Sequence, residues 1–126
     1  MTDRELMDIA RRAAENAYAP YSRFKVGAAL ETETNKVYTG CNVENAALGD
    51  TICAERTAAC KAVSEGDTKF KRIAIWGEGD DYCMPCGSCR QFLLEFSDDM
   101  EVLCAKAGGR YVSYKLSQLI PHPFKF

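Results

Sequence analysis

Two short cysteine-bearing segments place the strongest constraint on how this chain can fold. The first reads Cys53-Ala54-Glu55-Arg56, and the second, about thirty residues further on, reads Pro85-Cys86-Gly87-Ser88-Cys89-Arg90. Cys86 and Cys89 have the three-residue offset that puts two side chains on one face of a helical turn. If Cys53 supplies a third thiolate, the fold must bring the two segments together. Three thiolates with one open position would form a catalytic zinc site.

Glu55 completes this interpretation. The fourth zinc position has to stay open for water, so we expect Glu55 to move protons to and from that water instead of binding the metal. Because Glu55 follows Cys53 by only two residues, their side chains can converge only if Cys53 lies at the very start of a helix. The alternative for Glu55 is a first-turn glutamate that complements the helix dipole.

Cys83 leaves the ligand set open when spacing alone is considered. The run from Cys83 to Cys89 contains two overlapping Cys-x-x-Cys pairs. Such a pair at a helix start is also typical of thiol–disulfide exchange, although that interpretation leaves Cys53 and Glu55 unexplained. A purely structural zinc site is a third interpretation, and it would need a fourth protein ligand such as Cys83.

Composition argues against several classes of function. The 126 residues are 47% hydrophobic and 27% charged, which suits one globular domain spanning residues 1–126. A net charge of −2 without a Lys/Arg stripe argues against duplex nucleic acid as a partner. Charged residues interrupt the early sequence and no apolar run is long enough to span a bilayer, so we predict neither a signal peptide nor a membrane partner. Seven cysteines without a secretory signal then indicate reduced thiols or metal ligands in the cytoplasm.

Hydrophobic periodicity predicts the element order α-β-β-α-β-α-β-β. Capping-box spacing at Thr2 and Glu5 starts a first helix, which ends before Pro20. The other expected elements are strands over 24–30 and 37–43, a helix over 53–64, a strand over 73–76, a helix over 87–96, strands over 102–105 and 111–116, and a helical turn over 117–120. Helices between strands cover both sheet faces, and hairpins at both ends make the sheet mixed. We therefore predict an α/β fold, a three-layer α-β-α sandwich around a mixed sheet of about five strands.

Taken together, the cysteine segments resemble the signature of zinc-dependent cytidine deaminases, specifically the small enzymes that act on free nucleosides. The resemblance runs from about Asn16 to Phe124 and includes residues 19–30 and 40–46. In this family a proline directly precedes the first ligand of the Cys-x-x-Cys pair. The resemblance therefore selects Cys53, Cys86 and Cys89 as ligands of one Zn²⁺ per chain, in the expected deaminase-like sandwich.

The resemblance also implies a reaction. Cytidine and 2′-deoxycytidine would be hydrolysed to uridine and 2′-deoxyuridine plus ammonia, as part of pyrimidine salvage. A zinc-bound hydroxide would attack C4 of the pyrimidine while Glu55 shuttles protons. Arg56 would donate hydrogen bonds to the cysteine sulfurs and offset the surplus negative charge of three thiolates. The alternative for Arg56 is a solvated helix residue.

Five residues are implied in substrate binding, namely Phe24, Asn42, Glu44, Ala54 and Phe124. Asn42 and Glu44 alternate along an expected strand end and offer the donors and acceptors that ribose hydroxyls need. Phe24, expected to begin the first strand, would stack on the pyrimidine ring. Without the resemblance, these would be interpreted as a polar strand end and a core aromatic.

The family further implies a homotetramer with shared active sites, in which Phe124 reaches into a neighbouring chain's site. Pro121 and Pro123 would stiffen that approach by fixing φ. The alternative is that Phe124 packs on its own chain or frays with the terminus.

The choice of nucleoside has two open aspects. Leu48 replaces an aromatic that is frequent in the family, and Gly49 is also unusual, so the preference between ribose and deoxyribose is not set by the resemblance. A cytosine-bearing antibiotic nucleoside is an alternative substrate for the same fold. The presence of both Asn42 and Glu44 favours the ordinary nucleoside.

The remaining cysteines and the single histidine receive structural interpretations. Cys41, Cys60 and Cys104 are predicted to be small buried residues in strands and helices. His122 stands between two prolines near the C-terminus and is predicted to lie on the surface.

Overall fold

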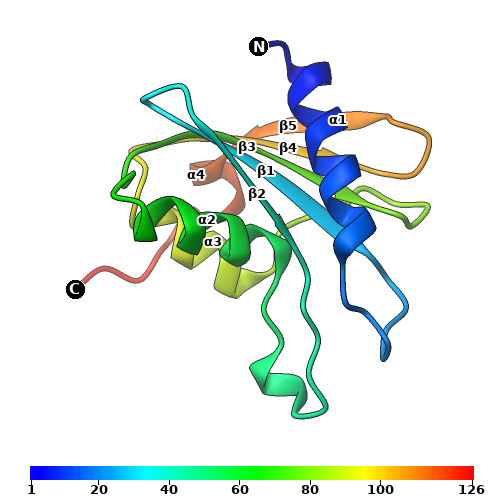
Figure 1. The fold of residues 1–126 in the computed structure, drawn as a ribbon. Coiled ribbons are helices and arrows are strands. Elements are labelled where there is room, and N and C mark those ends of the chain that lie inside the picture. The colour runs from blue at the N-terminus through cyan, green and yellow to red at the C-terminus, as the bar shows by residue number, and fades with distance from the viewer.

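A computed structural model describes all 126 residues and shows one mixed sheet between helices (Figure 1). Helix α1 (Asp3–Ala13) covers one face of the sheet, while α2 (Ala54–Ser64) and α3 (Gly87–Leu94) cover the opposite face. A short helix α4 (Leu116–Leu119) follows the last strand. The predicted three-layer α/β sandwich is confirmed.

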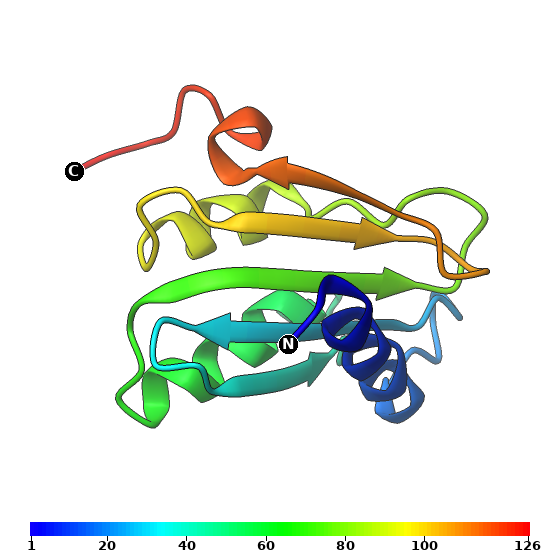
Figure 2. The ribbon, with the colours of Figure 1, turned by 90° about the horizontal axis from the view of Figure 1, so that it is seen from above.

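Five strands lie side by side in the order β2-β1-β3-β4-β5 (Figure 2). They are β1 (Val26–Thr32), β2 (Val37–Cys41), β3 (Phe70–Gly77), β4 (Glu101–Ala105) and β5 (Tyr111–Lys115). β3 and β4 pair in parallel, whereas the other neighbours pair antiparallel. A parallel pair needs a crossover connection, and α3 provides it. The predicted mixed sheet is therefore present.

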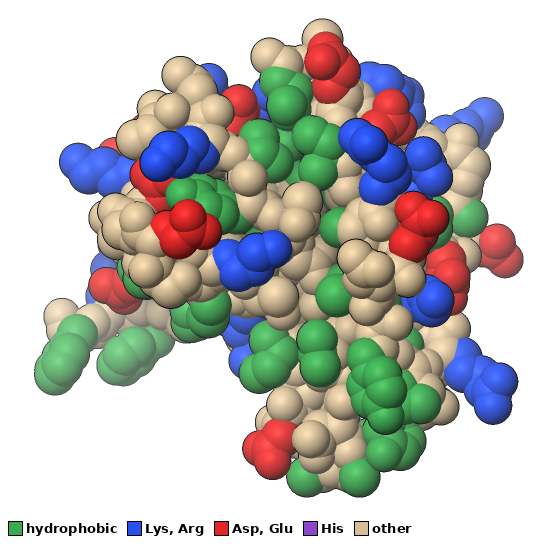
Figure 3. Space-filling view, viewed as in Figure 1, with side chains coloured by type: hydrophobic (Ala, Val, Ile, Leu, Met, Phe, Trp, Pro, Cys, Tyr) green, Lys and Arg blue, Asp and Glu red, His purple; other side chains and the backbone are tan.

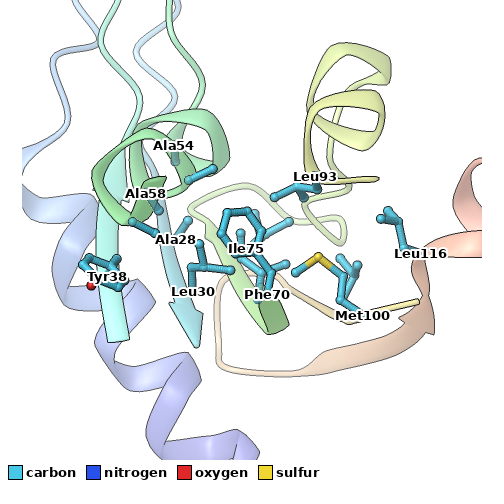
Figure 4. Packing of buried hydrophobic residues seen from close by; sticks show 14 of the residues in the cluster. Ala28, Leu30, Tyr38, Ala54, Ala58, Phe70, Ile75, Leu93, Met100 and Leu116 are labelled. Atoms are coloured by element: carbon cyan, nitrogen blue, oxygen red, sulfur yellow. The ribbon is translucent and has the colours of Figure 1, made fainter. Parts of the chain in front are cut away.

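Burial follows from this layering. β1 lies inside the sheet and is buried along nearly its whole length, whereas the edge strand β5 is only partly buried. The larger core fills the space between the sheet and helices α2 and α3. There, Ala54 and Ala58 of α2 and Leu93 of α3 meet Leu30 and Ile75 of the sheet (Figure 4). None of the helices has both the length and the apolar character needed to cross a membrane.

Several element ends differ from the sequence prediction. The capping box at Thr2 and Glu5 is present, but α1 ends at Ala13 and continues as the 3₁₀ turn η1 (Ala14–Asn16). Strand β1 begins at Val26 instead of residue 24, and β2 ends at residue 41 instead of 43. Here the Val26 N–H donates to the side chain of Asn42 at 2.9 Å, while the Asn42 carbonyl accepts from Tyr18. These side-chain and loop bonds interrupt the regular ladder.

Two glycines allow helices to approach the sheet closely. A Cβ at Gly27 in β1 would lie 1.9 Å from a backbone oxygen of α1. A Cβ at Gly40 in β2 would lie 2.3 Å from the Ala54 carbonyl oxygen and 2.5 Å from the Ala58 nitrogen of α2. Because these are helix backbone atoms, the whole helix would have to move to accommodate a side chain. Gly40 therefore determines how close α2, with Cys53 at its start, lies to the sheet.

We expect Gly40→Ala to lower the free energy of unfolding by about 3 kcal/mol, because overpacking forces a backbone shift. The matched control is Gly49→Ala, since a Cβ there meets nothing within 4 Å. That variant should stay within about 0.5 kcal/mol of the wild type. Urea denaturation of the three proteins measures both values. Equal stability of the two variants would show that α2 does not depend on Gly40.

Candidate metal centre

Two of the three candidate ligands stand at helix starts. Cys53 immediately precedes α2 and Cys86 immediately precedes α3, both with extended backbone, and neither side chain caps its helix. Cys89 follows in the first turn of α3. The free N–H groups and the partial positive charge of a helix N-terminus lie at these positions. The predicted helices over 53–64 and 87–96 are thus present, and each begins directly after a cysteine.

The three sulfurs form one cluster. Cys53 Sγ lies 3.8 Å from Cys86 Sγ, and Cys86 Sγ lies 3.5 Å from Cys89 Sγ, with all three within 4.8 Å of one another. A tetrahedral ion with Zn–S bonds of about 2.3 Å requires sulfurs roughly 3.8 Å apart. The donor type and the spacing therefore fit zinc, and the cluster consists of three cysteine ligands.

Cys83 lies apart from this cluster. It packs against the core beside the end of β3, where a Cβ at Gly77 would lie 2.8 Å from Cys83 Sγ. Burial raises the pKa of Cys83 to about 12, which keeps it a thiol at neutral pH. Of the two overlapping Cys-x-x-Cys pairs, the structure thus brings Cys86 and Cys89 to Cys53 and leaves Cys83 outside.

Neighbouring donors stabilise negative charge on the cluster. Hydrogen bonding from Cys89, and then from Arg56, lowers the pKa of Cys53 to about 5. The pKa of Cys89 is raised in turn, chiefly because its proton bonds to the Cys53 sulfur. A bound cation would replace such shared protons. The expected contact of Arg56 is present, since its Nη2 donates to Cys53 Sγ at 3.6 Å and to the Thr51 carbonyl at 3.4 Å.

Glu55 occupies the first turn of α2 and is 4% exposed. Burial, assisted by the nearby charge of Cys53, raises the pKa of Glu55 to about 7. A carboxyl that titrates near neutral pH is suited to both accepting and donating protons. Cys53 is the residue before the helix, which is the position that the two-residue offset requires if its side chain and that of Glu55 are to converge.

Asn42 and Glu44 hold the loop between η1 and β1. Asn42 accepts from the Val26 N–H and donates to the Phe24 carbonyl at 2.8 Å. Glu44 accepts from two backbone N–H groups of the loop, at 2.9 and 3.1 Å, and from the Ser22 hydroxyl. These bonds, that of Ser22 foremost, lower the pKa of Glu44 and keep it ionised. Both side chains are almost fully buried, which local sequence patterns did not indicate.

Two further predicted substrate contacts need adjustment. Phe24 lies in the loop before β1, not at the start of the strand, and the residue is 36% exposed. Ala54 has a fully buried side chain that belongs to the core. Only the backbone of Ala54, at the start of α2, could therefore contact a substrate.

The C-terminal tail runs out from the body of the domain and exposes its hydrophobic side chains (Figures 1 and 3). Phe124 is 76% exposed, so little of it packs on its own chain. Gln91 of α3 nevertheless holds its backbone. The Gln91 amide donates to the Phe124 carbonyl at 3.0 Å and accepts from the Phe124 N–H at 3.3 Å. These two hydrogen bonds were not predicted from the sequence, because nothing in the local pattern around Gln91 indicates a contact with the C-terminal tail.

The other cysteines and the histidine give a mixed result. The prediction that Cys60 is buried is wrong, because it lies on the solvent side of α2 and is exposed. Cys104 is buried as predicted, and Cys41 is half-buried. His122 is exposed, as expected for a surface residue.

Comparisons with known proteins agree with this geometry. Residues 1–106 match the family model described as the cytidine and deoxycytidylate deaminase zinc-binding region. The chain is 46% identical to a probable cytidine deaminase of Dictyostelium discoideum over 119 residues, covering 94% of this chain and 80% of that protein. It is 42% identical to a cytidine deaminase of Sporosarcina psychrophila, covering 95% and 89% of the two chains.

Solved structures show the same likeness. The crystal structure of cytidine deaminase from Burkholderia pseudomallei is 44% identical and superposes with a TM-score of 0.95, covering 98% of this chain and all of that one. Cytidine deaminase from Mycobacterium tuberculosis is 38% identical with a TM-score of 0.84, and the match covers both chains completely.

The position of Cys83 leads to a direct test of the ligand set. We expect Cys86→Ala to lose the bound metal, because two thiolates cannot replace three. Cys83→Ala should keep one zinc per chain, since that thiol lies outside the sulfur cluster. Elemental analysis of both purified variants and of the wild type makes the comparison. Loss of zinc from Cys83→Ala would show that the wrong Cys-x-x-Cys pair has been chosen.

Proposed function

The chain belongs to the cytidine and deoxycytidylate deaminase family, in its small bacterial form, and from this premise we propose how its residues carry out the reaction. It is a zinc-dependent cytidine deaminase, a hydrolase whose zinc site is formed by Cys53, Cys86 and Cys89. The proposed substrates are cytidine and 2′-deoxycytidine, converted to uridine and 2′-deoxyuridine plus ammonia in pyrimidine salvage. The proposed catalytic unit is a single domain over residues 1–126.

One observation carries this proposal. The buried carboxyl of Glu55 lies in the first turn of α2, two residues after Cys53, and Cys53 belongs to a cluster of three sulfurs that are spaced for a tetrahedral ion. A structural zinc site would need a fourth ligand and would have no use for such a carboxyl. A disulfide exchange site would leave both Cys53 and Glu55 without a role.

The proposed chemistry assigns the proton transfers to Glu55. When bound, zinc lowers the pKa of a coordinated water so that it becomes a nucleophile near neutral pH. Glu55 accepts the proton released as the water oxygen attacks C4 of the pyrimidine, and passes it to ring N3. Glu55 then moves the second water proton to the exocyclic amine, which leaves as ammonia. Arg56 holds the Cys53 sulfur through its hydrogen bond and offsets the surplus negative charge of the ligands.

Four further residues are proposed to position the nucleoside. Asn42 and Glu44 would use their remaining hydrogen-bonding capacity for the sugar hydroxyls. Phe24 would stack on the pyrimidine, and the backbone of Ala54 would contact the base from the start of α2. Because the loop bonds of Asn42 and Glu44 also support Phe24, sugar and base contacts would depend on one another.

The proposed activity is tested by measuring ammonia release from cytidine with and without a chelator. The wild type should release ammonia, lose activity when zinc is removed, and recover it when zinc is restored. Deamination that persists without metal would contradict the zinc-dependent mechanism.

Glu55→Gln tests the proton transfers separately from metal binding. Glutamine keeps the shape of the side chain but cannot carry protons, so kcat should fall by at least about 10²-fold. Zinc content and fold should be retained, because Glu55 is not a ligand. Steady-state kinetics with elemental analysis checks both expectations. Near-normal turnover in this variant would remove Glu55 from the mechanism.

We also propose that the working form is a homotetramer with shared active sites. The exposed ring of Phe124, on a tail that Gln91 holds by the backbone, supports this proposal. A ring presented away from its own chain is available to close a neighbour's pocket. Pro121 and Pro123 restrict φ on either side of His122, which limits the entropy lost when the tail docks.

Phe124→Ala should raise KM for cytidine roughly two- to tenfold, the range for one aromatic contact, without emptying the zinc site. Phe126→Ala is the matched control, since it removes another exposed aromatic side chain from the same tail. A chain truncated before Phe124 should regain activity when mixed with full-length Glu55→Gln, because each supplies what the other lacks. Sedimentation should show four chains per particle. A fully active monomer would contradict the proposal.

A further inference from the structure

The backbone of Phe24 is fixed on both sides of its side chain. Its N–H donates to Ser22 Oγ at 3.0 Å, and its carbonyl accepts from Asn42 Nδ2 at 2.8 Å. The ring itself is only partly covered, with 36% of the residue exposed. With the backbone held, the position of the ring depends on the surface against which it packs.

That surface is made of glycine backbone at the end of β3. A Cβ at Gly79 would lie 2.8 Å from Cε1, 3.5 Å from Cζ and 3.8 Å from Cδ1 of Phe24. A Cβ at Gly77 would lie 2.9 Å from the same Cζ. Carbon atoms in favourable contact are about 3.5–4.0 Å apart, so the ring occupies space that is free only because both residues lack side chains.

The two glycines differ in what else a side chain would meet. A Cβ at Gly77 would also clash with Cys83, at 2.8 Å from both its Cβ and its Sγ. At Gly79 the three atoms nearest to such a Cβ all belong to the Phe24 ring, and the φ of Gly79 is not positive, so alanine fits its backbone. A side chain at position 79 would therefore act first on the ring.

The backbone around Gly79 is itself held in place. Its carbonyl accepts from the Ala107 N–H at 3.0 Å, and Glu78 bonds to Lys25 through both its backbone N–H and its side chain. A new side chain at position 79 would thus displace the flexible end of Phe24 and not the loop.

The ring and Cys83 flank the same glycine. A Cβ at Gly77 would lie 2.9 Å from Phe24 Cζ and 2.8 Å from Cys83 Sγ. Cys83 stands three residues before the zinc ligand Cys86, so the segment that supports the ring leads directly to the ligand-bearing start of α3.

We propose that Gly79 is a positioning residue that sets the depth of the Phe24 ring and thereby the space for the pyrimidine base. This inference rests on the proposed stacking role of Phe24. An alanine at position 79 would push the ring by more than about half an ångström toward its exposed side, where the base would lie. Glycine at this position keeps the ring withdrawn against β3.

The test measures cytidine kinetics and uridine binding for Gly79→Ala. We expect KM for cytidine and Kd for uridine to rise roughly two- to tenfold, in line with one aromatic contact, while kcat changes less than about twofold. Zinc content and Tm should match the wild type, because no core atom is displaced. Unchanged KM and Kd would overturn the inference.

A double-mutant comparison distinguishes positioning from a general effect on the loop. Phe24→Leu removes the Cε1 and Cζ atoms that meet position 79, so Gly79→Ala should have no further effect in that background. An equal increase in both backgrounds would overturn the inference, even if Gly79→Ala lowers stability. If Phe24→Leu alone leaves KM for cytidine unchanged, the proposed stacking role of Phe24 is wrong. If Phe24→Leu raises KM but Gly79→Ala does not, the stacking role stands and the inference about Gly79 is wrong.

Discussion

The meeting of two helix N-termini at one point is the constraint on which the rest of this structure depends. Three cysteine sulfurs lie within 4.8 Å of one another, and as the thiolate ligands of a metal ion they would repel one another unless positive charge compensates. The starts of α2 and α3 and the guanidinium of Arg56 provide part of that charge. The spacing of the sulfurs is set by the core beneath them, where alanines of α2 and Leu93 of α3 pack on the sheet. A change in the packing of this core would therefore be expected to change the affinity for the metal as well.

The substrate side of the site depends on a different kind of support. Asn42 and Glu44 are both buried, and their side chains form hydrogen bonds with backbone groups of the loop before β1 and of its first residue. That loop carries Phe24 to the glycine surface at the end of β3. A change at either polar residue would consequently affect both sugar recognition and the aromatic wall. Loops that carry binding residues are often held in this way by a rigid scaffold.

The metal cluster was predictable because its two cysteine segments resemble a known zinc-binding signature. Spacing alone did not choose between the two overlapping Cys-x-x-Cys pairs. The order of elements was also predictable from periodicity, and the sandwich follows from that order. The exact start of β1 was not, because the side chain of Asn42 takes a bond that the strand ladder would otherwise use. Cys60 was misplaced because nothing local distinguishes the two faces of the alanine-rich helix α2. The contacts of Gly79 with Phe24 and of Gln91 with Phe124 join segments far apart in the chain, so they emerge only in three dimensions.

The coordination number of the bound zinc tests the central claim most directly, namely that three cysteines bind the metal and leave one position open for chemistry. X-ray absorption at the zinc edge reads the ligand shell of the intact protein in solution. We expect three sulfur neighbours at about 2.3 Å and one oxygen or nitrogen neighbour at about 2.0 Å. A shell of four sulfurs would contradict the claim, because it would close the position that the buried carboxyl of Glu55 is placed to serve.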